Sequence, residues 1–381
     1  MIANYRMLVL VALVVLIFGC GGDSSKTVSQ SCSVQALPQE FAYQLSTSGD
    51  GTAVSMFTLN TCTGAISPTA PPTAPTGLLP GQMAAEDMVV DPLGRFAYIA
   101  NLVSNASDQA NIAMFTINRS TGILTPTTPA TVPTGFLPQE IAIDPSGKFV
   151  YTANSDDNTV SMLTINPSTG VLTPTTPPTV AAGWAPGFLT ADPSGRFFYV
   201  TNRDDATISM YTINSATGVL SPTFPATVHA GADPFAITVD PSDRFVYVAD
   251  DLANLVWQYT INPATGVLTP MTPPSAAAGQ GTTGVTLDPS GKFAYATNRL
   301  DNTVSMFIVD QVTGALAPNS KATIPAGSLP FRVLFDPSGK FLYVVNEGSA
   351  TSVYTMNNDG TLTPAGTTGS GSIAMAIAAF K

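Results

Sequence analysis

The 381-residue sequence predicts an all-β fold, a seven-bladed β-propeller with four-stranded antiparallel blades, on three observations. A phrase of the form Asp-Pro-Ser-Gly-Lys/Arg-Phe-x-Tyr recurs, with small departures, from Asp91, Asp144, Asp192, Asp240, Asp288 and Asp336. Its last four intervals are 48 residues each, a period typical of propeller blades. Seven Phe-x-Tyr pairs indicate seven blades, and one unmatched apolar segment at the C-terminal end indicates how the ring closes.

One repeat, residues 138–183, accounts for a whole blade. Asp-Pro-Ser-Gly suits a type I turn, because Asp favours the first position, Pro presets φ at the second and Gly is favoured at the fourth. Aromatic residues alternate after this turn, as in a strand with one buried face. The expected strands are 138–143, 149–154, 159–166 and 171–176, followed by a link rich in Pro, Ala and Gly.

The two ends of the repeat array complement one another. No apolar strand ending in Asp-Pro precedes Phe41, so the first blade lacks an inner strand. The apolar segment 372–377 follows the last blade and has no partner of its own. We therefore expect the C-terminal strand to join the N-terminal blade, which closes the ring and hides two sheet edges.

The N-terminal residues look like a targeting segment. Arg6 precedes an apolar stretch of residues 7–18, too short to span a bilayer, and Leu-Ile-Phe-Gly-Cys20 looks like a bacterial lipoprotein lipobox. We expect a signal peptide over 1–19, a lipidated Cys20 with a tether over 20–35, and the propeller over 36–381. An uncleaved anchor is the alternative. The expected location is the exported side of the membrane, the outer membrane where there is one.

Cysteine count and charge restrict the remaining chemistry. With Cys20 assigned to lipid, Cys32 and Cys62 form an even pair, which in an exported protein indicates a disulfide. A net charge of −11 and a pI near 4.3 argue against nucleic acid and against anionic membrane surfaces as partners. A single histidine leaves little for a metal site or a His-based triad. We expect a monomer without metal or cofactor, in contact with the membrane only through its lipid.

The candidate site lies where the inner strands begin. Six residues, each four positions before an Asp-Pro turn, are expected to ring the mouth of the central channel: Asp87, Glu140, Phe188, Ala236, Gly284 and Arg332. Nearby links contribute charged and aromatic residues. Our candidates for catalysis are Glu140, His229 and Arg332, and those for ligand binding are Glu86, Asp87, Asp233, Trp184, Phe235 and Phe331.

The hypothesis for this mouth is acid–base chemistry on a small ligand. Glu140 or Asp87 would act as general base on a water, and Arg332 would hold a carboxylate or phosphate of the substrate. The alternative is that these are ordinary rim residues of a water-filled channel.

Several motifs resemble a known family. Tyr199-Val-Thr-Asn202, its variants in other blades and the Asp-Pro-Ser-Gly turns resemble the YVTN-repeat propellers of prokaryotic cell surfaces and the seven-bladed lactonase family. That family includes 6-phosphogluconolactonases and muconate-lactonizing enzymes, and the resemblance covers about residues 36–381. It implies His, Glu and Arg at the channel mouth, where His229, Glu140 and Arg332 correspond by position alone.

Two functions follow from these observations. The first is a binding or interaction platform at the cell envelope, whose partner is a small molecule such as a lactone, or an envelope protein or glycan. The alternative is a lactone hydrolase, similar to 6-phosphogluconolactonase, with its site at the channel mouth. Fold alone does not separate them.

Overall fold

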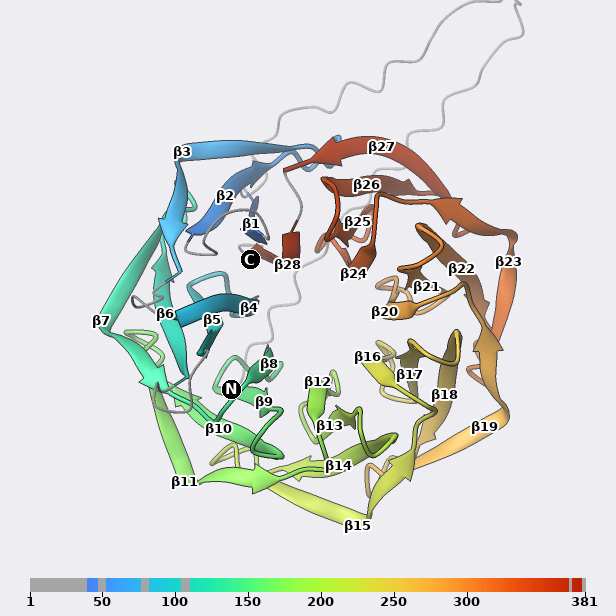
Figure 1. The fold of residues 1–381 in the computed structure, drawn as a ribbon, viewed down its shortest axis with the longest axis horizontal. Coiled ribbons are helices and arrows are strands. Elements are labelled where there is room, and N and C mark those ends of the chain that lie inside the picture. Colours follow the sequence, from blue (N-terminus) through green and yellow to red (C-terminus); the bar gives the residue numbers. More distant parts are fainter. Residues whose placement is uncertain (1–39, 47–52, 77–81, 104–109, 370–371, 379–381) are drawn as a thin grey trace, which may run out of the picture. The chain divides into compact units, whose positions relative to one another are not determined.

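A computed structural model describes residues 40–46, 53–76, 82–103, 110–369 and 372–378 of the protein. These residues contain 28 strands and no helix, and the strands form seven four-stranded antiparallel sheets. The sheets stand around a common axis as the blades of a ring (Figure 1). The all-β, seven-bladed prediction is therefore confirmed. None of the described residues forms a helix long and apolar enough to cross a membrane.

Each blade runs outward from an inner strand beside the channel to an outer strand at the rim (Figure 1). The inner strands are β28 (Ser372–Ala378), β4 (Gln82–Val90), β8 (Pro138–Ile143), β12 (Pro186–Ala191), β16 (Pro234–Val239), β20 (Thr282–Leu287) and β24 (Pro330–Phe335). The second strands are β1 (Glu40–Ser46), β5 (Phe96–Val103), β9 (Phe149–Asn154), β13 (Phe197–Asn202), β17 (Phe245–Asp250), β21 (Phe293–Asn298) and β25 (Phe341–Asn346).

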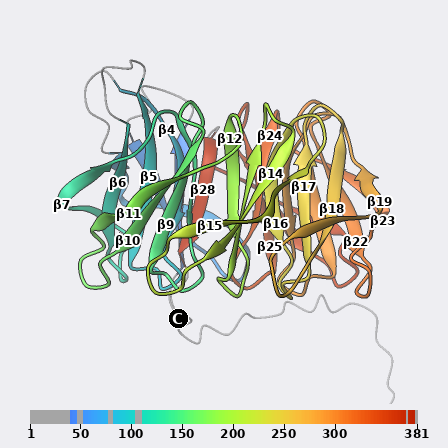
Figure 2. The same cartoon turned by 90° about the horizontal axis from the view of Figure 1, so that it is seen from below.

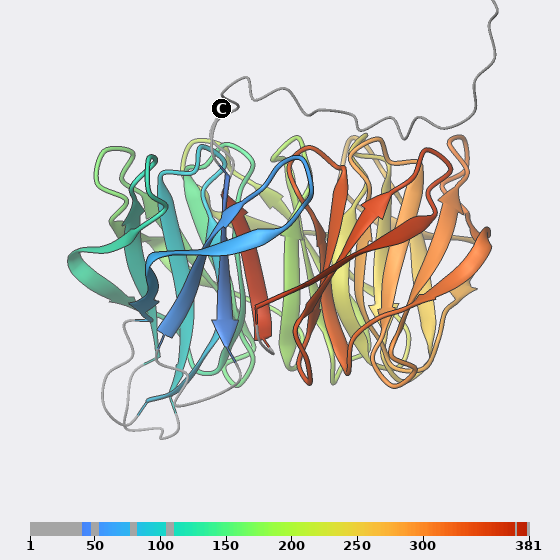
Figure 3. The ribbon, with the colours of Figure 1, turned by 90° about the horizontal axis from the view of Figure 1, so that it is seen from above.

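The third and outer strands complete each blade. The third strands are β2 (Ala53–Leu59), β6 (Asn111–Ile117), β10 (Thr159–Ile165), β14 (Thr207–Ile213), β18 (Leu255–Ile261), β22 (Thr303–Val309) and β26 (Thr351–Met356). The outer strands are β3 (Ile66–Pro75), β7 (Leu124–Pro133), β11 (Leu172–Ala181), β15 (Leu220–His229), β19 (Leu268–Ala277), β23 (Leu316–Pro325) and β27 (Leu362–Thr368). Figures 2 and 3 show from two sides that inner strands run nearly along the axis, whereas outer strands are strongly tilted.

The ring closes as expected, through the C-terminal strand. β28 pairs antiparallel with β1, with Tyr43 opposite Ala376, and the first sheet has the order β28-β1-β2-β3. Figure 1 shows this red strand beside the blue strands of the N-terminal blade. This pairing covers the inner edge of β1 and one edge of β28, which would otherwise be unpaired.

The Phe-x-Tyr pairs hold neighbouring blades together. Each tyrosine hydroxyl donates to the carbonyl of a glycine in the next blade's third-to-fourth-strand turn, and the tyrosines are completely buried. The seven bonds, 2.6–2.9 Å long, are Tyr43–Gly122, Tyr98–Gly170, Tyr151–Gly218, Tyr199–Gly266, Tyr247–Gly314, Tyr295–Gly360 and Tyr343–Gly64. The paired phenylalanine packs on the same glycine: a Cβ at Gly218 would lie 2.3 Å from Phe149. The bonds run without interruption around the ring.

The Asp-Pro turns are held by their own aspartates. Asp144 Oδ1 accepts hydrogen bonds from the backbone N–H groups of Lys148 and Phe149, at 2.8 and 2.7 Å. The same pattern recurs in the other turns, for example at Asp192 and Asp240. Because these carboxylates already accept the hydrogen bonds that hold the turns, we do not consider them as catalytic or binding groups.

The outer strands are longer than the sequence suggests. The stretch expected to be a link after residue 176 is the second half of β11, which continues to Ala181. The outer strands β3, β7, β15, β19 and β23 have the same length of ten residues, whereas β27 has seven. An outermost strand is hydrogen-bonded on one side only, so proline can stand there without removing a ladder bond. A register shift opposite Met162, between Ser161 and Leu163, accommodates the proline-rich part.

Several expectations concern residues outside the described part of the chain. The signal peptide over 1–19, lipidation at Cys20 and the tether over 20–35 all lie there. Cys62, in the turn between β2 and β3, is disulfide-bonded. Its expected partner, Cys32, also lies outside the described residues.

Candidate functional site

The register of the blades brings two sets of loops to one side of the ring. Pro138 at the start of β8 pairs with Asn154 at the end of β9, and Pro186 pairs with Asn202 in the same way. The starts of the inner strands therefore lie beside the hairpins between second and third strands. We call this side the mouth side, and the side with the Asp-Pro turns the turn side.

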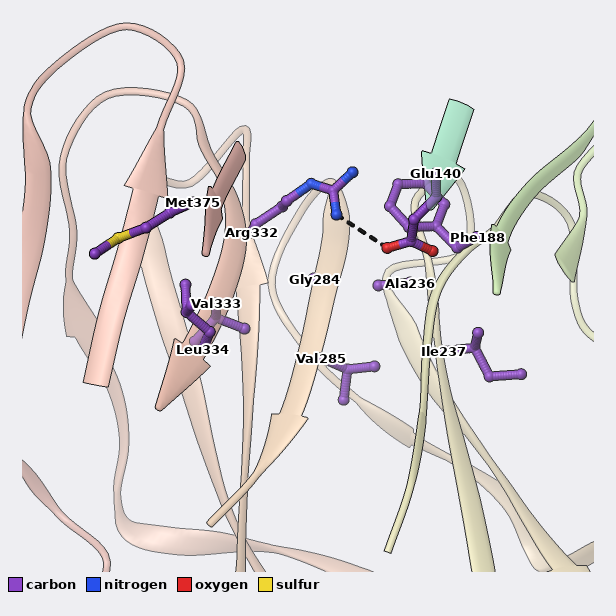
Figure 4. A pocket seen from close by; sticks show the side chains of 10 residues that line it. All are labelled: Glu140, Phe188, Ala236, Ile237, Gly284, Val285, Arg332, Val333, Leu334 and Met375. Atoms are coloured by element: carbon purple, nitrogen blue, oxygen red, sulfur yellow. Dashed lines mark hydrogen bonds and ion pairs between the residues drawn. The ribbon is translucent and has the colours of Figure 1, made fainter. Parts of the chain in front are cut away.

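A cavity of about 150 Å³ occupies the channel near the mouth side. It is lined by Glu140, Phe188, Ala236, Ile237, Gly284, Val285, Arg332, Val333, Leu334 and Met375. Five of these belong to the six positions that the repeat predicts to ring the mouth. Figure 4 shows Glu140 and Arg332 pointing toward one another, with Ile237, Val285 and Leu334 farther along the channel. At about 30 Å³ per water, the cavity has room for about five waters, the scale of a small ring compound.

Arg332 reaches across the channel to the two acidic members of the ring. Its Nη1 donates to Glu140 Oε1 at 2.9 Å, and it lies 3.2 Å from Asp87 Oδ1. The three side chains come from β24, β8 and β4, which belong to three different blades. All three are largely buried, with side-chain exposures of 19%, 16% and 6% for Arg332, Glu140 and Asp87. This cluster, the Arg332–Glu140–Asp87 triad, is the centre of the site.

Backbone groups fix the orientation of the two carboxylates. Asp87 Oδ2 accepts a hydrogen bond from Ile141 N at 3.1 Å, and Glu140 Oε2 accepts one from Leu189 N at 2.6 Å. Each bond joins an inner strand to the next blade, so the carboxylates sit on the scaffold and not on loops. Each carboxylate oxygen can accept a second hydrogen bond, which leaves Glu140 able to bind a water.

Burial sets the protonation behaviour of the triad. It raises the pKa of Glu140 to about 7, a rise that Arg332 opposes and that the Asp87 carboxylate reinforces. Burial likewise raises the pKa of Asp87 and of the neighbouring Glu86, and Arg332 opposes both rises. Because these carboxyl groups interact closely, they titrate together. Near neutral pH the cluster can therefore both accept and release a proton.

Arg332 has hydrogen-bonding capacity left over. Its Nε is buried without a hydrogen-bond partner, and Nη2 makes no hydrogen bond within the described residues. The guanidinium also lies over aromatic rings, with its Cζ 5.2 Å from the centre of Phe188 and 5.9 Å from that of Phe331. An unsatisfied buried donor costs about 1–3 kcal/mol. An oxygen acceptor bound in the cavity beside Arg332 would relieve that cost.

A second layer of charges surrounds the mouth. Arg203 Nε and Nη2 bind both oxygens of Asp233 at 2.8 Å, and Arg299 Nη2 binds Glu347 Oε2 at 2.7 Å. Burial and the Asp233 carboxylate raise the pKa of Asp251, while both arginines lower it. These five residues, the rim network, form alternating charges around the opening.

Of the predicted site residues, Glu140 and Arg332 line the cavity, and several others lie around the triad without lining it. Phe235 and Phe331 pack with Phe188, at centroid distances of 4.6 and 6.4 Å from it. Arg332 lies over Phe188 and Phe331, whereas Arg203 lies over Phe235. Asp233 holds Arg203 in the rim network. Glu86 lies within the electrostatic reach of Arg332.

His229 and Trp184 are not brought to the triad. His229 is the exposed last residue of the outer strand β15, where its ring lies against Trp257 at 5.4 Å, and it does not line the cavity. Trp184 is 66% exposed in an interblade link, with its backbone N–H bound to Asp205. His229 was expected in a link beside the mouth, but the longer outer strand keeps it at the rim.

Sequence reasoning missed the rim arginines. Arg203 and Arg299 each follow the asparagine that ends a second strand, and Asp251 and Glu347 hold the equivalent place in their blades. Aligning the repeats at that position would have revealed a column of alternating charge. Met375 of β28 was also missed, because only the closed ring brings it to the cavity.

The comparisons with known proteins agree with this architecture. The family model described as "Lactonase, 7-bladed beta-propeller" matches residues 51–185, 174–279 and 269–378. No curated protein matches the chain.

Similar solved structures include a candidate 6-phosphogluconolactonase from Bacteroides uniformis, with 21% identity and a TM-score of 0.74 over 89% of this chain and 99% of that one. A second, from Bacteroides fragilis, has 20% identity and a TM-score of 0.74 over 91% and 99%. The periplasmic gluconolactonase of Pseudomonas aeruginosa has 16% identity and a TM-score of 0.71 over 90% and 99%. At these identities the solved structures establish the fold alone. The family match spans most of the propeller, and the chain belongs to the seven-bladed β-propeller lactonase family.

Proposed function

We propose that this protein is a lactone hydrolase whose active site is the Arg332–Glu140–Asp87 triad at the channel mouth. The observation that carries the proposal is a buried carboxylate with a pKa of about 7 beside a guanidinium with unused donors, both lining a small cavity. Perturbed acids in a concave site are typical of catalysis. Membership of the lactonase family supports the same reaction.

The chemistry assigned to the triad is hydrolysis of a ring ester. Ionised Glu140 takes a proton from a water, and the water oxygen attacks the lactone carbonyl carbon. The spare donors of Arg332 stabilise the negative charge that develops on the carbonyl oxygen. The bond between the carbonyl carbon and the ring oxygen then breaks, the proton passes to the leaving alkoxide, and a hydroxy acid results.

Asp87 acts as a positioning residue in this scheme. Its carboxylate lies 3.2 Å from Arg332 Nη1 and is fixed by Ile141 N, so it holds the guanidinium across the channel. Compared with the hypothesis drawn from sequence, this scheme changes the use of Arg332. Two carboxylates already compensate its charge, which favours contact with a carbonyl oxygen over capture of a phosphate.

We also propose that the reaction takes place outside the cytoplasm, on a chain held to the membrane by lipid at Cys20. This rests on the lipobox-like segment and on the pairing expected for Cys32 and Cys62. Radiolabelled fatty acid incorporated by the wild type and not by Cys20→Ser would support the anchor. Incorporation by both would contradict it.

The test of activity is a panel of lactones, comprising sugar lactones with and without phosphate and muconolactone-like rings. Ring opening is measured for the purified wild type, Glu140→Gln and Glu40→Gln. Glu40 is a matched control, since burial raises its pKa to about 7 as well, but it lies at the turn side near Asp336. We expect turnover by the wild type and Glu40→Gln only. No turnover by folded wild type on any lactone would leave a binding platform as the function.

A further inference from the structure

The mouth side of the ring is strongly acidic. Within the described residues, twelve carboxylates stand at the starts of inner strands, in the adjoining links or in the hairpins beside them: Glu86, Asp87, Glu140, Asp156, Asp157, Asp204, Asp205, Asp233, Asp250, Asp251, Asp301 and Glu347. The cations placed there are three guanidiniums, those of Arg203, Arg299 and Arg332. A ligand entering the channel must pass this excess of negative charge.

Each of the three guanidiniums is already neutralised. Arg203 spends two donors on both oxygens of Asp233, and Arg299 spends Nε and Nη2 on Glu347 Oε2, at 3.1 and 2.7 Å. Arg332 is shared by Glu140 and Asp87. Recognition of a phosphate normally uses uncompensated Arg or Lys, in the bidentate geometry that Asp233 occupies here. A phosphate at the mouth would therefore meet repulsion from carboxylates, without a guanidinium whose charge is left uncompensated.

The other basic residues in the described segments cannot supply that partner. The turn residues Arg95, Lys148, Arg196, Arg244, Lys292 and Lys340 follow Asp-Pro turns on the opposite side of the ring, and Arg119 lies in a turn on that side as well. Lys321 stands in the outer strand β23. Among the described residues no lysine is placed at the mouth.

We propose that the substrate is an uncharged lactone without phosphate or carboxylate groups, and that the carboxylates of the rim network exclude anionic lactones. This rests on the proposed hydrolase function and adds the substrate class. The same field serves product release, because hydrolysis turns a neutral ring into a hydroxy carboxylate. A field that concentrates cations and depletes anions at the opening repels that product outward.

The test compares two substrates that differ only in charge, glucono-δ-lactone and its 6-phosphate. We measure kcat/KM for each with the wild type, subtracting spontaneous ring opening, at ionic strengths of about 0.02 M and 0.5 M. We expect the neutral lactone to be favoured on the order of tenfold at low salt. Salt should narrow this ratio by raising kcat/KM for the phosphate, and should leave the neutral lactone nearly unchanged.

Variants of the rim network test whether its carboxylates cause the preference for the neutral lactone. Asp233→Asn and Glu347→Gln each remove one carboxylate and release a guanidinium, so each should raise kcat/KM for the phosphorylated lactone about threefold or more relative to the neutral one. Asp243→Asn removes a carboxylate from the turn side and should leave the ratio unchanged. If a rim variant does not fold, the salt dependence of the wild type decides alone.

The outcomes separate this inference from the function on which it rests. Preference for the phosphorylated lactone, equal use of both, or a ratio that salt does not narrow would overturn the neutral-substrate proposal and leave the hydrolase intact. Hydrolysis of neither lactone, nor of any other in the panel, would overturn the hydrolase and this inference with it.

Discussion

Replacing Arg332 by methionine should destabilise the fold in a pH-dependent way, because it leaves two buried carboxylates, Glu140 and Asp87, without a compensating positive charge. The N–O separations are 2.9 Å to Glu140 and 3.2 Å to Asp87. With an effective dielectric constant of ~20, each attraction is worth about 5 kcal/mol before desolvation is subtracted. Removing one partner of a buried pair costs about 3–5 kcal/mol in measured cases. We expect Arg332→Met to lose about 3 kcal/mol of unfolding free energy at neutral pH.

The sign of the pH dependence follows from the pKa shifts. Burial already raises the pKa of Glu140 to about 7 and that of Asp87 above its ordinary value, and loss of Arg332 removes the charge that opposes both rises. A carboxyl whose pKa is higher in the folded state stabilises that state while protonated, and the contribution disappears as pH rises through the folded pKa. The loss of unfolding free energy in Arg332→Met, relative to the wild type, should therefore be small near pH 5 and larger above about pH 8.

The assay is urea unfolding of the wild type and Arg332→Met at pH 5, 7 and 8.5, with Arg299→Met as control. Arg299 also pairs with a carboxylate, but at the rim, where its side chain is 36% exposed. Such a pair is worth about 0–1 kcal/mol. A deficit for Arg332→Met no larger than the control's, or one that does not grow with pH, would refute the account of a buried, mutually compensating triad.

Three further predictions concern Glu140, the interface between two blades and the disulfide of Cys62. The kcat/KM of lactone hydrolysis should fall tenfold per pH unit below about pH 7, since Glu140 must be ionised to act as base, and a flat profile from pH 5 to 8 would contradict that role. Tyr151→Phe should cost about 1 kcal/mol of unfolding free energy, because it removes one interblade hydrogen bond, and Gly218→Ala should cost about 1–3 kcal/mol, because its Cβ would meet Phe149 at a φ of +74°. Urea unfolding measures both, and a neutral Gly218→Ala would contradict the packing. Peptide mapping without reduction should join Cys62 to Cys32, and a peptide joining Cys62 to any other cysteine would contradict that pairing.

Local turn chemistry made most of the fold predictable. Asp144 and its equivalents indicate the turn because their hydrogen bonds reach only a few residues along the chain. The Phe-x-Tyr pairs indicate the number of blades because each blade carries one such pair. Closure of the ring was predictable because the N-terminal blade lacked an inner strand and the C-terminal segment had no partner. β28 pairs with β1 and fills that place. The length of the outer strands was not predicted. Proline usually indicates the end of a strand, but an edge strand tolerates it.

For the candidate site, the sequence indicated which residues stand at the channel mouth but not which of them contact one another. Counting four residues back from each Asp-Pro turn found Glu140, Arg332 and Asp87, because each of their inner strands ends directly before its Asp-Pro turn, which places equal positions at equal depth. That Arg332 crosses the channel to both carboxylates depends on distances between blades, and Arg332 and Glu140 are 192 residues apart in sequence. His229 was misplaced by the same error that shortened β15.

The most direct test of the central claim is proton release during ring opening of the best lactone in the panel, at constant pH 7.5. Wild type, Glu140→Gln and Glu40→Gln are compared at equal concentration, with folding verified for each. We expect proton release well above the spontaneous rate for the wild type and Glu40→Gln, and a rate about 100-fold or more lower for Glu140→Gln. Equal rates for the wild type and Glu140→Gln would contradict the central claim.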